Sequence, residues 1–125
     1  MRNIQSKAQY HGRAQYRGDD GVYVSPTPIT AGSEVTIKYD GLLARSGADQ
    51  IYLHYGFGDN DNWKEPRDIP MTLTVDNMWT TTVPIDIDET SNLNFCFHDS
   101  ANNWDNFNKA NWSYQIHNGE NPTQF

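Results

Sequence analysis

Apolar and polar residues alternate in short segments along most of the chain, and this period of two constrains the fold more than any other feature. The segments lie near 22–24, 35–39, 51–55, 71–75, 79–85, 93–97 and 112–116, and clusters of Gly, Pro, Asn and Asp separate them. Because successive side chains of a β-strand point to opposite faces, each segment buries one row of side chains and presents the other outward. Helical periodicity is absent. The pattern therefore predicts an all-β fold, an immunoglobulin-like antiparallel β-sandwich of about seven strands.

The length of 125 residues gives room for one domain with a single core. We expect a flexible basic N-terminal arm at 1–21, the sandwich at 22–118 and a C-terminal tail at 119–125. The arm contains Arg2, Lys7, Arg13 and Arg17 and shows neither helical nor strand periodicity. Such a segment is typical of a solvated tail or of a contact with an acidic surface.

Charge and composition exclude several classes of partner. The net charge of −7 argues against nucleic acid, because phosphate neutralisation requires clustered Lys and Arg. No apolar run is long enough to span a membrane, and the first residues lack the apolar core of a secretory signal.

The lone cysteine, Cys96, excludes an internal disulfide and a metal site with several thiolates. We expect no cofactor, no metal and a cytoplasmic location, with secretion as part of a larger enzyme as the alternative.

The 4 tryptophans are of two kinds. Trp79 and Trp112 fall in step with the buried rows of their segments, which predicts that they pack in the core. Trp63 and Trp104 lie in polar loops rich in Asn and Asp, where no apolar period surrounds them. At about 25 cal/mol per Å², an exposed indole forgoes a few kcal/mol of burial, so two of them indicate a binding surface. The alternative is that these loops fold back over one end of the sandwich.

The polar residues near these tryptophans suit a sugar. A pyranose offers a face of C–H groups to an indole ring and a rim of hydroxyls to Asn, Asp and His side chains. Tyr52 and His54 form the outward row of the segment 51–55, and the loops supply Asn60, Asn62, Asn103, Asp105 and Asn106. This mixture favours a neutral, hydroxyl-rich ligand over a phosphate. His98 and His117 end their segments on polar faces and are expected to be solvated.

Three blocks of sequence follow one another in a characteristic order. They are the strand Ile51-Tyr52-Leu53-His54-Tyr55-Gly56 with Trp63 in the next loop, then Met71 and Trp79, and finally Leu93-Asn94-Phe95-Cys96-Phe97-His98-Asp99 with Trp104-Asp105-Asn106. This order, over roughly 22–117, resembles the starch-binding carbohydrate-binding modules of families 25 and 53.

The resemblance implies a non-catalytic β-sandwich that holds α-1,4-linked glucan on a shallow surface of one histidine and two tryptophans. Those roles fall on His54, Trp63 and Trp104, and the Asp-Asn pair after the second tryptophan would support or contact the sugar. The family commonly continues with a second Asn where this chain has Phe107. The predicted carbohydrate-binding residues are His54, Trp63, Trp104, Asp105, Asn106, Tyr52 and Asn103. The expected partner is starch, glycogen or a maltooligosaccharide, bound by a module that is attached to a glucan-active enzyme or acts beside one.

Other functions were weighed on the same residues. A glycosidase needs two facing carboxylates, and aspartates do lie in the loops, but a domain this small has little material for a deep site. We therefore predict that the chain is not an enzyme. An immunoglobulin-like protein-interaction module is the stronger rival, and it would use a strand edge or the basic arm. Calcium in the loop 59–62 is disfavoured because the glycine and terminal glutamate of a calcium loop are missing.

Overall fold

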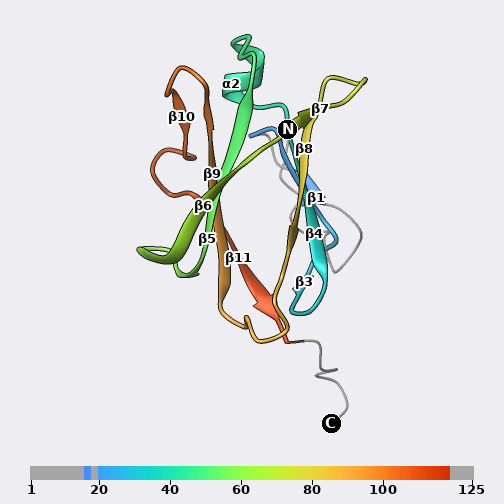
Figure 1. Ribbon diagram of the computed structural model, residues 1–125, viewed down its shortest axis with the longest axis vertical. Coiled ribbons are helices and arrows are strands. Elements are labelled where there is room, and N and C mark those ends of the chain that lie inside the picture. Colours follow the sequence, from blue (N-terminus) through green and yellow to red (C-terminus); the bar gives the residue numbers. More distant parts are fainter. Residues whose placement is uncertain (1–15, 18–19, 119–125) are drawn as a thin grey trace.

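The computed structural model describes residues 16–17 and 20–118. Two β-sheets face each other in two layers, with one short helix near one end of the molecule (Figure 1). Among the described strands every pairing is antiparallel except one. The predicted all-β sandwich is confirmed.

The first sheet consists of β1 (Tyr16–Arg17), β2 (Val22–Ser25), β4 (Glu34–Tyr39), β8 (Trp79–Pro84) and β7 (Thr72–Leu73), in that order. The second consists of β3 (Ile29–Thr30), β11 (Trp112–His117), β9 (Asn92–Asp99), β5 (Ile51–Asp59) and β6 (Asn62–Pro70), and β10 (Trp104–Asp105) pairs with β9. The helix α2 spans Leu42–Arg45. The parallel pair is β3 with β11.

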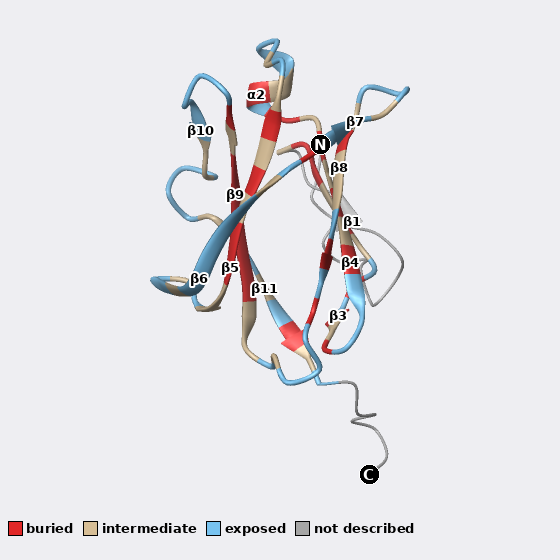
Figure 2. Ribbon diagram, in the orientation of Figure 1, coloured by how far each residue is buried: buried red, intermediate tan, exposed pale blue. Residues whose placement is uncertain are grey.

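The structure contains more strands than the sequence pattern predicts, and the extra strands are edges or very short. β6 is an edge strand that is exposed along most of its length (Figure 2), so its residues show no alternation of burial. The segment 71–75 forms only the two-residue strand β7. At Met71, just before it, the chain crosses from the second sheet to the first, and the Met71 amide donates to the Ile51 carbonyl oxygen at 2.9 Å. Helix α2 was not predicted because it is a single turn.

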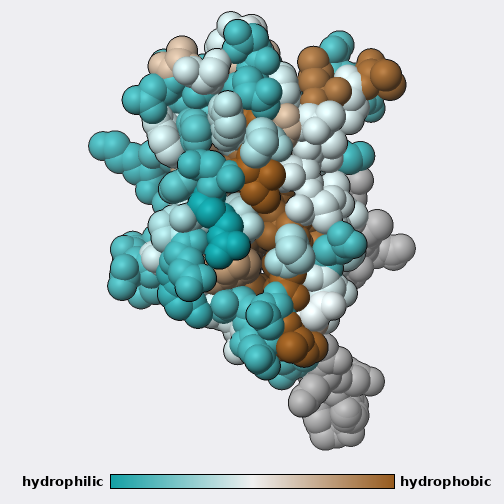
Figure 3. Space-filling view, in the orientation of Figure 1, coloured by the Kyte–Doolittle hydropathy of each residue, from teal (hydrophilic) through white to brown (hydrophobic). Residues whose placement is uncertain are grey.

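The core lies between the sheets and contains the predicted inward rows. Tyr39 of β4 stacks on Phe97 of β9 across the two layers, with ring centroids 4.0 Å apart. Trp79 and Trp112 are buried, which confirms their prediction as core residues. The Trp112 indole N–H donates to Asp20 Oδ2 at 2.7 Å. In the space-filling view a hydrophobic band follows the seam between the two sheets, and hydrophilic side chains cover much of the remaining surface (Figure 3).

Most of the predicted arm and tail lies outside the described residues. Residues 1–15, 18–19 and 119–125 are not described. Within the predicted arm, β1 pairs with β2 through the Cα partners Tyr16 and Val24. No helix in the described part of the chain is long and apolar enough to cross a membrane.

Candidate functional site

The outer face of the second sheet, which points away from the core, gathers several side-chain rings. They are Tyr52 and His54 of β5, Trp63 of β6, His98 of β9 and Trp104 of β10, and we call them the ring cluster. In the strand register, Tyr52 is opposite His98, and His98 is opposite Trp104. Because opposed residues of antiparallel strands point to the same face, the register makes neighbours of rings that are far apart in the sequence.

His54 lies between the two tryptophans of the ring cluster. Its centroid is 5.5 Å from the Trp63 ring and 5.3 Å from the Trp104 ring, with interplanar angles of 32° and 89°. His98 extends the row, 4.4 Å from Trp104 and 4.9 Å from Tyr52. The expectation that His98 is solvated is wrong, because only 16% of its side chain is exposed between these two rings.

A β-bulge in β6 allows Trp63 and Asp68 to point to the same face of the sheet. Asp68 is opposite His54 and Trp63 is opposite Gly58, so both point to the outer face, although they are an odd number of residues apart. Between them β6 has one extra residue, and Glu65 takes a positive φ of 49°. A strand without this irregularity would turn one of the two side chains towards the core.

Trp63 is held against the sheet by a hydrogen bond and by its close approach to Gly56. Its indole N–H donates to the Asn60 carbonyl oxygen at 2.8 Å. A Cβ on Gly56 would lie 2.9 Å from Trp63 Cβ, so the glycine lets the side chain approach the strand closely. The ring is therefore half-buried and fixed in orientation, and one part of it remains open to a ligand.

One carboxylate joins the two histidines of the ring cluster. Asp68 Oδ1 lies 2.8 Å from His54 Nδ1 and 3.0 Å from His98 Nε2. Partial burial opposes ionisation of Asp68, but the hydrogen bonds and positive charge that the two imidazoles offer outweigh it and lower the pKa of this carboxyl. Asp68 was not predicted from the sequence, because the residues of β6 show no periodic pattern that would place it beside His54.

The loop between β9 and β10 carries Trp104 and is built on Asp99. Asp99 Oδ1 accepts the backbone N–H groups of Ala101 and Asn103 at 3.0 and 2.8 Å, and Asp99 Oδ2 accepts from Asn103 Nδ2 at 3.1 Å. These bonds, above all the one from the Asn103 backbone, lower the pKa of Asp99. Trp104 itself is 44% exposed, and its indole N–H donates to Asn102 Oδ1 at 2.9 Å.

Three of the predicted residues make hydrogen bonds that support the loops. Asn103 is bound to Asp99, as described above, and Asn106 Oδ1 accepts the Lys109 backbone N–H at 3.0 Å. Asp105 is opposite the buried Phe97, and its Oδ2 accepts the Tyr39 hydroxyl at 2.6 Å. The structure thus brings together Tyr52, His54, Trp63 and Trp104, and leaves Asn103, Asp105 and Asn106 in supporting positions.

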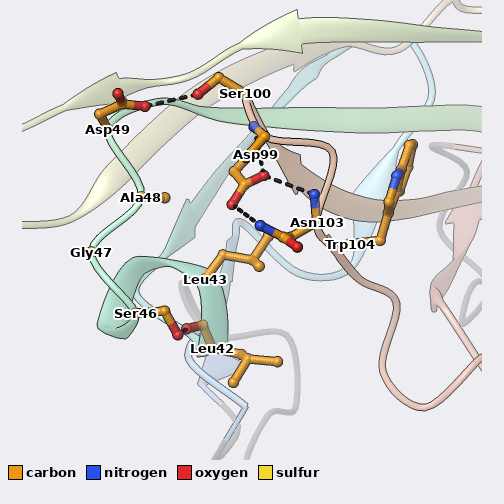
Figure 4. Close-up of a pocket in the computed structure, with 11 residues that line it drawn as sticks. Leu42, Leu43, Ser46, Gly47, Ala48, Asp49, Asp99, Ser100, Asn103 and Trp104 are labelled. Carbon is orange, nitrogen blue, oxygen red and sulfur yellow. Dashed lines mark hydrogen bonds between the residues drawn. The ribbon is translucent and has the colours of Figure 1, made fainter.

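A hollow of about 670 Å³ lies between α2 and the β9–β10 loop, and Trp104 of the ring cluster is one of the residues that line it. Figure 4 shows the Asp99 carboxylate bound to Asn103 inside it, and Ser100 donating to Asp49 at 2.8 Å across its edge. The carboxylates here are therefore occupied by bonds within the protein. In residues 20–118 no group of His, Cys, Asp and Glu side chains is arranged to hold a metal ion.

The fold and the ring cluster together define a class of protein. A row of partly exposed aromatic rings on the outer face of a β-sandwich is typical of a binding surface. Its apolar faces, with imidazole and carboxylate groups among them, suit a ligand that has both C–H faces and hydroxyls. The chain is thus a binding module built on an all-β sandwich.

The comparison with known families identifies the module. Residues 35–95 match the starch/carbohydrate-binding module (family 53). This match confirms the resemblance to starch-binding modules that was drawn from the sequence. The matched region contains β5 and β6 with His54, Trp63 and Asp68, and it ends before Trp104.

A curated relative also supports a carbohydrate-binding role. The chain is 37% identical over 100 residues to a protein named alpha-amylase from Clostridium acetobutylicum. The match covers 79% of this chain but 13% of the relative, so the chain spans only about an eighth of that protein's length. No solved structure matches the chain. The match to a family of binding modules supports the prediction that the chain is not an enzyme by itself.

Proposed function

We propose that this module binds α-1,4-glucan, such as starch, glycogen or maltooligosaccharides, without catalysis. The observation that supports this most directly is the position of His54 between Trp63 and Trp104, at 5.5 and 5.3 Å. Glucose rings would stack on the two indoles, and His54 would hydrogen-bond a hydroxyl between them.

The orientation of the two indoles favours a curved glucan. Trp63 and Trp104 make different angles, 32° and 89°, with the same imidazole plane, so their rings are not parallel. An α-1,4-linked chain turns from one glucose to the next, whereas a cellulose chain is a flat ribbon. A platform of two inclined rings therefore fits the former better.

The affinity of one such site should be modest. A few stacked rings and hydrogen bonds must offset the ordering of the sugar chain and the desolvation of its hydroxyls. Attachment to a catalytic domain or repetition in tandem would raise the effective strength. The family 53 match and the alpha-amylase relative support a place attached to, or beside, a glucan-active enzyme. The cytoplasmic location stays a prediction, with secretion as part of a larger enzyme as its alternative.

The rival function, protein interaction through a strand edge, finds little support at β6. An edge strand can accept a further strand only where its backbone N–H groups are free to donate. Pro66 and Pro70 lack that group, and Lys64, Arg67 and Asp68 place charges along the same edge. These residues are typical of an edge that resists pairing.

Affinity electrophoresis tests the proposal. We expect native gels that contain amylopectin or glycogen to retard the wild type, and gels that contain hydroxyethylcellulose to leave it unaffected. Trp63→Ala and Trp104→Ala should each lower the affinity at least about tenfold, because each removes a stacking surface worth a few kcal/mol. Phe107→Ala is the matched control, since it removes an exposed ring of the same region that stacks on Trp112 instead, 5.0 Å away.

The circular dichroism of each variant should show that the fold is retained. Retardation that persists unchanged in both tryptophan variants would refute the assigned site. Retardation by hydroxyethylcellulose equal to that by amylopectin would refute the preference for α-1,4-glucan.

A further inference from the structure

Asp68 joins two side chains that the sequence does not connect. A single oxygen, Oδ1, is within hydrogen-bond distance of His54 Nδ1 and of His98 Nε2. A carboxylate can only accept at neutral pH, so each of these ring nitrogens must carry a proton to make its bond. Asp68 therefore decides which nitrogen of each ring is the donor.

For His54 the consequence is a defined hydrogen-bonding character towards a ligand. With Nδ1 donating to Asp68, a neutral imidazole keeps its lone pair on Nε2. Among the described residues no group is hydrogen-bonded to Nε2 of His54. This nitrogen is then an acceptor, and its natural complement is the O–H of a sugar.

For His98 the consequence is a fixed ring orientation, on which two neighbouring rings pack. Its ring packs 4.4 Å from Trp104 and 4.9 Å from Tyr52. His98 Nε2 bonds to Asp68 at 3.0 Å, whereas Nδ1 lies 3.3 Å from the Asp99 carbonyl oxygen. Both oxygens only accept, so a neutral ring donates to one of them, and the shorter contact favours Asp68. Because the Trp104 ring packs on the His98 ring, a fixed orientation of His98 also restrains Trp104.

We propose that Asp68 is a positioning residue of the ligand-binding face, which orients His54 and His98 together and presents Nε2 of His54 as a hydrogen-bond acceptor for a sugar hydroxyl. This inference rests on the proposed glucan-binding function. Asp68 acts through the two imidazoles, and nothing in the argument requires it to touch the sugar. The β-bulge in β6 is what allows this residue and Trp63 to share the outer face.

The position of Asp68 makes the test practical. The side chain is 48% exposed on an edge strand, so replacing it should leave the core intact. Asp68→Ala removes the acceptor, and Asp68→Asn keeps an oxygen acceptor without the charge. Asp88→Asn is the control for charge, since it removes one negative charge from the exposed connection between β8 and β9.

Two measurements on the full chain separate positioning from general stability. Nitrogen-15 NMR of the histidine rings reports the tautomer of His54 and His98, and titration calorimetry with maltoheptaose reports the affinity. We expect the wild type and Asp88→Asn to show the Nδ1–H tautomer of His54 and equal affinities. Asp68→Ala should lose the dominance of that tautomer and weaken binding about tenfold, as expected for one charge-assisted hydrogen bond. Asp68→Asn should fall between them.

The outcomes distinguish this inference from the function on which it rests. A wild type with His54 mainly in the Nε2–H tautomer, or an Asp68→Ala variant that binds maltoheptaose as well as the wild type, overturns the role of Asp68 while glucan binding stands. A wild type that binds no maltoheptaose overturns the proposed function, and the role of Asp68 in that function falls with it, even where the tautomer is the expected one.

Discussion

Tyr39 shows how a single buried hydroxyl connects the core to the loop that carries Trp104. Its oxygen donates to Asp105 Oδ2 at 2.6 Å and accepts the Leu43 backbone N–H at 3.0 Å. Burial, together with the hydrogen bond to Asp105, raises the pKa of the Tyr39 hydroxyl far above its ordinary value of 10.0. Asp105 therefore anchors β10 to the core, and its part in sugar binding stays a prediction.

Replacing this hydroxyl should cost stability. Tyr39→Phe keeps the stacking on Phe97 but leaves the Leu43 N–H and the Asp105 carboxylate without their partner. Since unpaired polar groups at buried positions cost about 1–3 kcal/mol, we expect the free energy of unfolding in urea to fall by that amount. Glucan affinity should fall less than in Trp104→Ala, because the indole itself is retained. A variant as stable as the wild type would show that the hydroxyl does not anchor the loop.

Cys96 is a second buried residue whose environment changes its chemistry, and it lies on the outer face of the second sheet. It is opposite His54 in the register, yet it is buried beneath the ring cluster. Burial, helped by the nearby charges of Asp68 and Asp105, raises the pKa of its thiol to about 12. Cys96 thus packs on the outer face, and its raised pKa argues against a reactive role.

We therefore expect Cys96 to be inert in the native protein. Only the thiolate attacks a disulfide reagent, so at neutral pH its reaction with such a reagent should be slower than that of the unfolded chain by on the order of a thousandfold. Absorbance of the released thiol, followed with and without denaturant, measures the two rates. Equal rates would mean that the outer face opens readily around the ring cluster.

At the scale of elements, the hairpin of β5 and β6 determines how much of the site could be read from the sequence. The alternation in β5 is regular, so the outward position of Tyr52 and His54 follows from its period of two. β6 is exposed on both faces and contains a bulge, and neither property leaves a periodic signal. This is why Asp68 escaped prediction, although Trp63 was found from its lack of apolar neighbours.

A substitution in the same hairpin tests how closely Trp63 packs on Gly56. Gly56 lies beneath the indole, and an added Cβ would meet Trp63 Cβ at 2.9 Å and the Lys64 carbonyl oxygen at 3.2 Å. Neither atom is the end of a flexible side chain, so Gly56→Ala should push β6 and its indole away from His54. We expect several-fold weaker glucan binding and a loss of about 1 kcal/mol in stability, as is usual for overpacking. Binding isotherms and thermal melts of the variant measure both, and unchanged binding would place the sugar away from Trp63.

The hydrogen-bond partners in the β9–β10 loop also could not be predicted from the sequence. Its tryptophan and its polar character are evident in the sequence, but the partners of its polar side chains are not. The sequence predicted Asn103 and Asp105 as carbohydrate-binding residues, with the Asp-Asn pair after Trp104 supporting or contacting the sugar. In the structure Asn103 bonds to Asp99 and Asp105 bonds to Tyr39. The bond between Tyr39 and Asp105 joins segments that are distant in the chain, so a local pattern does not contain it. The bond between Asp99 and Asn103 is local, but the alternation of apolar and polar residues carries no signal for it.

For the whole molecule, an acidic net charge of −7 coexists with carboxylates that the fold uses as hydrogen-bond acceptors. The lowered pKa values belong to Asp68, Asp76, Glu89 and Asp99. Two of them, Asp68 and Asp99, support the ring cluster and the Trp104 loop. Acid should therefore affect the fold and the ligand face together.

The sign of this effect follows from the direction of the shifts. A carboxyl whose pKa is lower in the folded than in the unfolded chain stabilises the fold above its ordinary pKa, which is 3.8 for Asp99. That contribution disappears as the pH falls through the lowered folded value, because protonation then favours the unfolded chain. We expect the free energy of unfolding to be constant from about pH 7 to pH 5 and to decrease from there to pH 2. Urea titrations at a series of pH values measure it. Asp99→Asn should be less stable at neutral pH and should show a shallower decrease in acid, and a decrease as steep as that of the wild type would mean that the Asp99 carboxylate does not hold the loop.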